Sequence, residues 1–186
     1  YTQGRRGVAG TVLVHKIIGS MAREGKSVSE LASYGKELVK DIKTVGIALS
    51  GATVPEVGKP GFVLADDEME FGVGIHGEPG YRREKIKDSY DIAKEIISKL
   101  KAEFNWQSGD SYGLFVNGMG ATPLMELFIL FNDAKKILSE EGIELTFNKV
   151  GNYMTSLEMA GASITMIKLD DERLRLLNEP VHTIAW

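Results

Sequence analysis

One short segment in the middle of the chain has residue types that could do chemistry. In Glu70–His76, apolar residues alternate with Gly72, Gly74 and His76. This alternation predicts a strand with one apolar face and one face that carries almost no side chains and ends at His76. A small ligand could lie against the bare backbone there and contact the imidazole. The alternative is that the glycines only permit close backbone packing and that His76 bonds to a loop carbonyl.

Two glycine-containing segments could in principle bind phosphate. Gly72, Gly74 and Gly77 match G-x-G-x-x-G, but Glu78–Gly80 is a turn sequence, whereas a dinucleotide site needs a helix to begin there. Gly118–Pro123 lies between a predicted strand and a predicted helix, where backbone N–H groups could hold an anion, although such turns are usually empty. No phosphate loop of the G-x-x-x-x-G-K-[ST] type and no G-x-S-x-G motif is present.

The other reactive side chains give weaker indications. Arg5 and Arg6 could meet phosphate or an acidic partner, and Asp66–Glu68 could bind a cation weakly, but both fit solvated charges as well. His15 lies in a predicted helix and His182 in a predicted loop, and the spacing of the three histidines does not predict a metal site. We therefore retain His76 as the candidate catalytic residue and expect no metal or cofactor bound by this chain.

Composition limits the class of protein. The 186 residues are 43% hydrophobic and 26% charged, which is ordinary for a globular domain with a sizeable core. The absence of cysteine excludes disulfides, cysteine-ligated metals and a thiolate nucleophile, and suits a reducing cytoplasm. A formal net charge of −4 gives no general attraction to nucleic acid, and no apolar run approaches the length of a membrane span. Because the first residue is Tyr1, we expect the chain to be the later part of a longer polypeptide.

The elements that would position His76 follow from hydrophobic periodicity. A helix is expected over Gly10–Glu24, and Ser27 with Glu30 has the spacing of a capping box that opens a second helix reaching Gly46. Strands and helices then interleave, which predicts an α/β domain with a mixed sheet and helices packed against it. Further helices are expected after Ser89, after Thr122-Pro123 and after Asp170 or Asp171, and strands over 112–117, 143–150 and 163–169.

Five segments, in order and over nearly the whole chain, resemble the dihydroxyacetone-binding subunits of dihydroxyacetone kinases. The match covers only the later half of such a subunit. The segments are GRRGVAGTVLVHKI (4–17), TVPEVGKPGF (53–62), DDEMEFGVGIHGEPG (66–80), NGMGATPLMEL (117–127) and TSLEMAGASITMIKLDDE (155–172).

The resemblance implies a role for His76. In that family the histidine of the G-I-H-G-E-P-G motif forms a covalent hemiaminal with the ketone carbon of dihydroxyacetone, and the matching residue is His76. The general base and the groups that bind the substrate hydroxyls belong to the earlier half of the subunit. The nucleotide, ADP or ATP with Mg²⁺, lies on a separate helical subunit or a fused domain, so this half alone is expected to be inactive.

The resemblance leaves the branch of the family open. One branch depends on the phosphotransferase system, another uses ATP directly, and a paralogous branch consists of transcriptional coactivators that sense dihydroxyacetone without turnover. Ser50–Thr53 departs from the Ser-Pro-Cys-Thr-like stretch expected there, and its effect is not assigned. We expect residues 1–45 to be a helical segment that completes the N-terminal domain, residues 46–186 to be the α/β domain, and the subunit to be a cytoplasmic homodimer.

Overall fold

A computed structural model describes residues 6–76, 78–184 and 186. Over these residues six strands form one sheet in the order β3-β2-β1-β6-β4-β5. The strands are β1 (Ile42–Ala48), β2 (Glu68–Phe71), β3 (Arg82–Lys85), β4 (Ser111–Gly118), β5 (Glu144–Gly151) and β6 (Gly161–Lys168). The α-helices are α1 (Gly10–Arg23), α2 (Val28–Leu38), α3 (Ser89–Phe104), α4 (Leu124–Glu140) and α5 (Asp171–Asn178).

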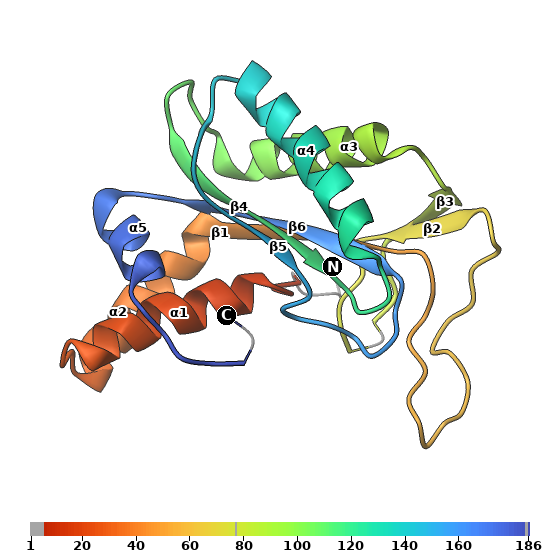
Figure 1. The fold of residues 1–186 in the computed structure, drawn as a ribbon, viewed down its shortest axis with the longest axis horizontal. Helices are drawn as coiled ribbons and strands as arrows, with labels where there is room; N and C mark the ends of the chain where they lie inside the picture. The colour runs from red at the N-terminus through yellow and green to blue at the C-terminus, as the bar shows by residue number, and fades with distance from the viewer. Residues whose placement is uncertain (1–5, 77, 185) are drawn as a thin grey trace.

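The sheet is mixed, and helices lie on both of its faces (Figure 1). β4 and β5 pair in parallel, with α4 between them in sequence, whereas the other neighbouring strands pair antiparallel. α3 and α4 cover one face, and α1, α2 and α5 lie on the other side of the sheet (Figure 1). The predicted α/β class with a mixed sheet is confirmed.

Each face of the sheet has its own hydrophobic core. Leu114 and Ile164 contribute to the core under α3 and α4, whereas Phe115 and Ile167 belong to the core on the α1 and α5 side. Successive strand residues point to opposite faces, so one central strand supplies both cores. Leu13 of α1 is fully buried in the second core, so α1 is part of this folded body.

Helix caps explain where several helices begin. Ser27 and Glu30 form the predicted capping box at α2. At α3 the cap is Asp88, whose carboxylate accepts the N–H of Asp91, so the prediction of Ser89 as the cap was one residue late. Thr122 was expected to cap α4, but its hydroxyl instead exchanges two hydrogen bonds with the backbone of Gly161, and the helix begins at Leu124.

The predicted extension of the second helix to Gly46 is wrong. α2 ends at Leu38, a 3₁₀ turn covers Val39–Asp41, and β1 begins at Ile42. β1 pairs along its whole length with β6, which satisfies its backbone groups in a way that local helical periodicity does not reveal. The expected junction between residues 45 and 46 therefore falls inside β1.

The strand predicted over Glu70–His76 is also shorter than expected. β2 ends at Phe71, because Gly72 adopts a left-handed conformation with φ of 80°. The ring of Tyr81 occupies the space that a Cβ at position 72 would need. As a result Phe71 lies in the core under α3 and α4 and Val73 in the other core, so the chain crosses from one face of the sheet to the other.

Candidate functional site

His76 lies in the loop that follows β2, and backbone hydrogen bonds fix both ends of this loop. At its start, the Gly72 N–H donates to the carbonyl of Gly46 at 2.7 Å. At its end, the Tyr81 N–H donates to the Phe71 carbonyl at 2.8 Å, and the Gly80 N–H donates to the buried Glu70 carboxylate at 2.6 Å. The loop is therefore closed at its base, as a binding loop on a rigid sheet should be.

The residues immediately before His76 are held against the second core. Val73 is completely buried and Ile75 packs partly against the same core. The Ser156 hydroxyl donates to the Ile75 carbonyl at 2.8 Å, and the Ser156 N–H donates to the Met119 carbonyl at 2.7 Å. Three segments distant in sequence thus meet beside the histidine.

The loop that carries Ser156 is itself fixed by a buried amide. The Asn117 side chain accepts the N–H groups of Tyr153 and Met154 and donates to the Met154 carbonyl. Asn117 is fully buried at the end of β4, so these three hydrogen bonds tie the loop to the sheet. Sequence reasoning did not identify Asn117 or Ser156, because neither has a partner close in sequence.

His76 itself projects into solvent, with 80% of its side chain exposed. Its backbone N–H donates to Glu78 Oε2 at 2.7 Å, and its Nδ1 lies 3.5 Å from Glu78 Oε1. The other ring nitrogen, Nε2, has no hydrogen-bond partner among the described residues. The imidazole is thus held from one side by a carboxylate and is accessible from the other.

Glu78 occupies a space that only glycine leaves free. A Cβ at Gly74 would overlap the Glu78 carboxylate, so the glycine that interrupts the predicted strand face makes room for this group. Arg6 Nη1 lies 3.8 Å from Glu78 Oε1. Glu78 was predicted only as part of a turn, although its position two residues after the histidine could have indicated a contact with the imidazole.

The environment keeps Glu78 ionised. Burial alone favours the neutral acid, but the backbone N–H groups of Glu78 and His76, the Arg6 guanidinium and the His76 side chain together hold the pKa of Glu78 below its ordinary value. The carboxylate therefore carries a negative charge at neutral pH and can only accept hydrogen bonds.

Of the other sequence candidates, Arg6 joins this site through Glu78, whereas the following ones do not. The N–H groups of Met119 and Ala121 donate to the carbonyls of Gly161 and Met159, so the turn considered as a weak phosphate candidate uses them internally. His15 and His182 are exposed elsewhere, and Asp67 pairs with Lys85. Arg5 and Gly77 lie outside the described residues. Within the described part of the chain, no group of three or more histidine or carboxylate side chains could hold a metal ion.

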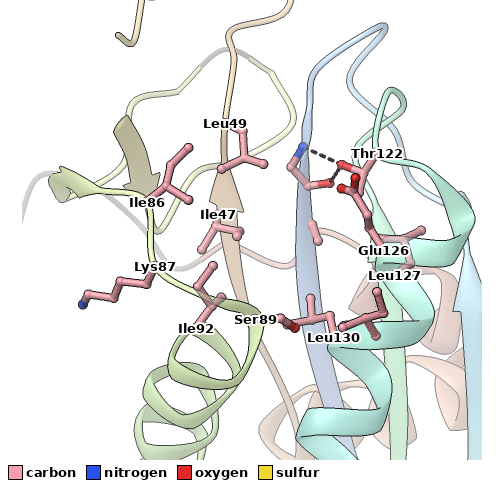
Figure 2. Close-up of a pocket in the computed structure, with 13 residues that line it drawn as sticks. Ile47, Leu49, Ile86, Lys87, Ser89, Ile92, Thr122, Glu126, Leu127 and Leu130 are labelled. Atoms are coloured by element: carbon pink, nitrogen blue, oxygen red, sulfur yellow. Dashed lines mark hydrogen bonds between the residues drawn. The ribbon is translucent and has the colours of Figure 1, made fainter. Parts of the chain in front are cut away.

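An apolar cleft lies on the opposite face of the sheet from Val73. The cleft lies between the first turns of α3 and α4, as Figure 2 shows. Its volume is about 250 Å³. Ile47 of β1, Leu49 just after that strand, Ile92 of α3 and Leu130 of α4 line it. None of the described residues of the His76 loop contributes to it. The cleft and the candidate residue His76 are therefore two separate places on the molecule.

Comparison with known proteins shows the family of the chain. The model of the Dak1 domain matches residues 1–185. The chain belongs to the Dak1 domain family. The resemblance of the five sequence segments to dihydroxyacetone-binding subunits is therefore confirmed, and the segment that contains His76 is one of them.

Three Dak1 proteins show how similar the relatives are. The chain is 64% identical over its whole length to the dihydroxyacetone-binding subunit of a PTS-dependent dihydroxyacetone kinase from Lactococcus lactis. It is 48% identical over 97% of its length to the DhaKLM operon coactivator DhaQ of the same species. A solved dihydroxyacetone kinase operon coactivator superposes with a TM-score of 0.89 at 46% identity, over 97% of this chain and 57% of that one. The chain spans 56% of the length of both Lactococcus relatives.

One further finding concerns membranes. Within the described residues of this Dak1 chain, no helix combines the length and the apolar character that crossing a bilayer requires.

Proposed function

We propose that this Dak1 chain is part of a dihydroxyacetone kinase and that His76 binds dihydroxyacetone as a covalent hemiaminal. The observation that carries the proposal is the position of the imidazole in the family motif, on a loop closed at its base, with Nδ1 toward a carboxylate and Nε2 toward solvent. The 64% identity to a dihydroxyacetone-binding subunit supports this substrate.

The proposed addition is balanced in atoms and charge. A ring nitrogen of neutral His76 forms a bond to the ketone carbon, and the C=O π electrons move to the oxygen. That oxygen takes up a proton, and the ring gives up its own N–H proton to solvent. Such a bond holds a ligand too small for strong noncovalent binding and selects ketones over glycerol, which has no carbonyl group.

The remaining parts of the kinase reaction belong to other segments in this proposal. The earlier half of the subunit supplies the general base and binds the substrate hydroxyls. A nucleotide-bearing subunit or domain with Mg²⁺ supplies the phosphoryl group, either from ATP directly or after a phosphocarrier has rephosphorylated its bound ADP. The whole subunit forms a cytoplasmic homodimer. This half alone then binds substrate without turnover.

A second candidate function is a dihydroxyacetone-sensing coactivator. The 48% identity to the coactivator DhaQ and the TM-score of 0.89 to a solved coactivator favour it specifically. Both candidates use His76 in the same way, so the catalytic step is what separates them. A coupled assay of the complete subunit with its nucleotide-bearing partner decides: formation of dihydroxyacetone phosphate supports the kinase, and substrate binding without that product supports the coactivator.

The first prediction is that His76→Ala abolishes the adduct and leaves the fold unchanged. The exposed side chain contributes little packing, so the thermal transition should stay within about 1 °C of the wild type. Native mass spectrometry of the complete subunit with dihydroxyacetone measures the adduct, and a soaked crystal shows whether density is continuous from the ring to a tetrahedral carbon. His15→Ala, which removes an exposed histidine from α1, is the control. Equal adduct formation in both variants contradicts the proposal.

A further inference from the structure

The contact between Glu78 and His76 has a consequence for the reactive nitrogen. A neutral imidazole carries one proton, on either Nδ1 or Nε2, and the partner of one nitrogen selects between the two forms. Nδ1 lies 3.5 Å from a carboxylate oxygen, a distance that a small side-chain rotation shortens to a hydrogen bond. Because an ionised carboxylate can only accept, the favourable arrangement places the proton on Nδ1.

The same carboxylate is positioned by two contacts and by the space that Gly74 leaves for it. Its Oε2 accepts the His76 N–H at 2.7 Å, its Oε1 lies 3.8 Å from Arg6, and the absence of a side chain at Gly74 gives it room. Only 29% of the Glu78 side chain is exposed, against 80% for His76. A carboxylate fixed in this way is oriented before the substrate arrives.

Building on the proposed function, we infer that Glu78 is a positioning residue for the hemiaminal. It holds His76 with the proton on Nδ1, so that the lone pair needed for attack lies on the exposed Nε2. While the C–N bond forms, the ring gains positive charge, and the carboxylate beside Nδ1 stabilises that charge. Gly74 acts through Glu78, because any larger residue displaces the carboxylate.

The test combines two variants with one control in the complete subunit. Glu78→Gln removes the charge and keeps the shape, and Gly74→Ala displaces the carboxylate and keeps its charge. Glu56→Gln makes the same change of charge at an exposed residue for which no hydrogen bond or ion pair is found among the described residues. If one of the first two variants fails to fold by circular dichroism, the other still tests the inference.

Nitrogen-15 NMR of the imidazole, without substrate, reads out the position of the proton. We expect the Nδ1–H form in the wild type and in Glu56→Gln, and a shift toward Nε2–H in Glu78→Gln and Gly74→Ala. With dihydroxyacetone, the adduct should be about ten- to a hundred-fold weaker in those two variants, as expected for loss of a charge-assisted hydrogen bond. A merely structural role would not move the tautomer.

Two results overturn the inference. One is a wild-type His76 that carries its proton on Nε2, and the other is an unchanged tautomer and adduct affinity in both Glu78→Gln and Gly74→Ala. Failure of the proposed function looks different, because then the wild type forms no adduct at all. In that case the substrate-free NMR measurement still decides whether Glu78 sets the tautomer.

Discussion

At the scale of single residues, Tyr112 is a buried acid whose titration couples to folding. The residue is fully buried in β4, its ring packs edge-on against Phe104 and Trp106, and its hydroxyl has no hydrogen-bond partner among the described residues. Burial, with smaller contributions from Asp110 and Asp41, raises the pKa of Tyr112 to about 12. The unfolded chain titrates near its ordinary value of about 10.

The sign of the pH effect follows from this difference. Below pH 10 the tyrosine is neutral in both states, and between pH 10 and pH 12 only the unfolded state loses the proton. Alkali should therefore destabilise the wild type, and by pH 12 the loss attributable to this group is on the order of 2 kcal/mol. Tyr112→Phe should lack this loss and be near neutral at pH 7, where it removes only an unpaired hydroxyl. Urea unfolding of both proteins from pH 8 to 12 measures the difference, and parallel curves contradict the prediction.

At the scale of elements, α3 begins beside two neighbouring residues, Asp88 and Ser89, that are both favourable types for a helix N-cap, but only one of them caps the helix. Asp88 accepts the N–H of Asp91 and caps the helix, whereas the Ser89 hydroxyl is buried and has no partner among the described residues. Asp88→Ala should cost about 1 kcal/mol of unfolding free energy, since it removes the cap. Ser89→Ala should be neutral or slightly stabilising. Chemical denaturation of the two variants tests the assignment, which fails if Ser89→Ala is the more damaging change.

At the scale of the whole molecule, α1 and α2 contribute unequally to the fold. Leu13 of α1 is fully buried in the second core with Phe115 of β4 and Leu176 of α5. Val28, at the start of α2, is 83% exposed. The first helix is thus integrated with the sheet. That residues 1–45 also complete an adjoining domain stays a prediction.

A matched pair of variants measures this integration. Leu13→Ala should reduce the unfolding free energy of this chain by about 2–5 kcal/mol, because it leaves a cavity in a closed core. Val28→Ala should change it by less than about 0.5 kcal/mol, since it alters an exposed position. The cooperative unfolding transition should remain single in both. If Leu13→Ala leaves the unfolding free energy unchanged, α1 does not pack on this sheet in solution.

The sequence by itself determined the features that depend on neighbours within one or two turns. The capping box at Ser27 and the strands around Leu114 and Ile164 were predicted from local spacing, and the α/β class followed from the order of the elements. The role of His76 stays a prediction. Local hydrogen bonds and periodic burial can be predicted from the types and spacing of residues that are close in sequence.

Tertiary structure decided what distant contacts control. Local periodicity predicts helix for residues 42–46, but pairing with β6 makes this segment a strand. Alternation predicts that Phe71 and Val73 share a face, but Gly72, packed under Tyr81, turns the chain across the sheet. The contact of Arg6 with Glu78 and the support of Ile75 by Ser156 join residues far apart in the chain. These contacts depend on the geometry of packing, which a one-dimensional pattern of residue types does not specify.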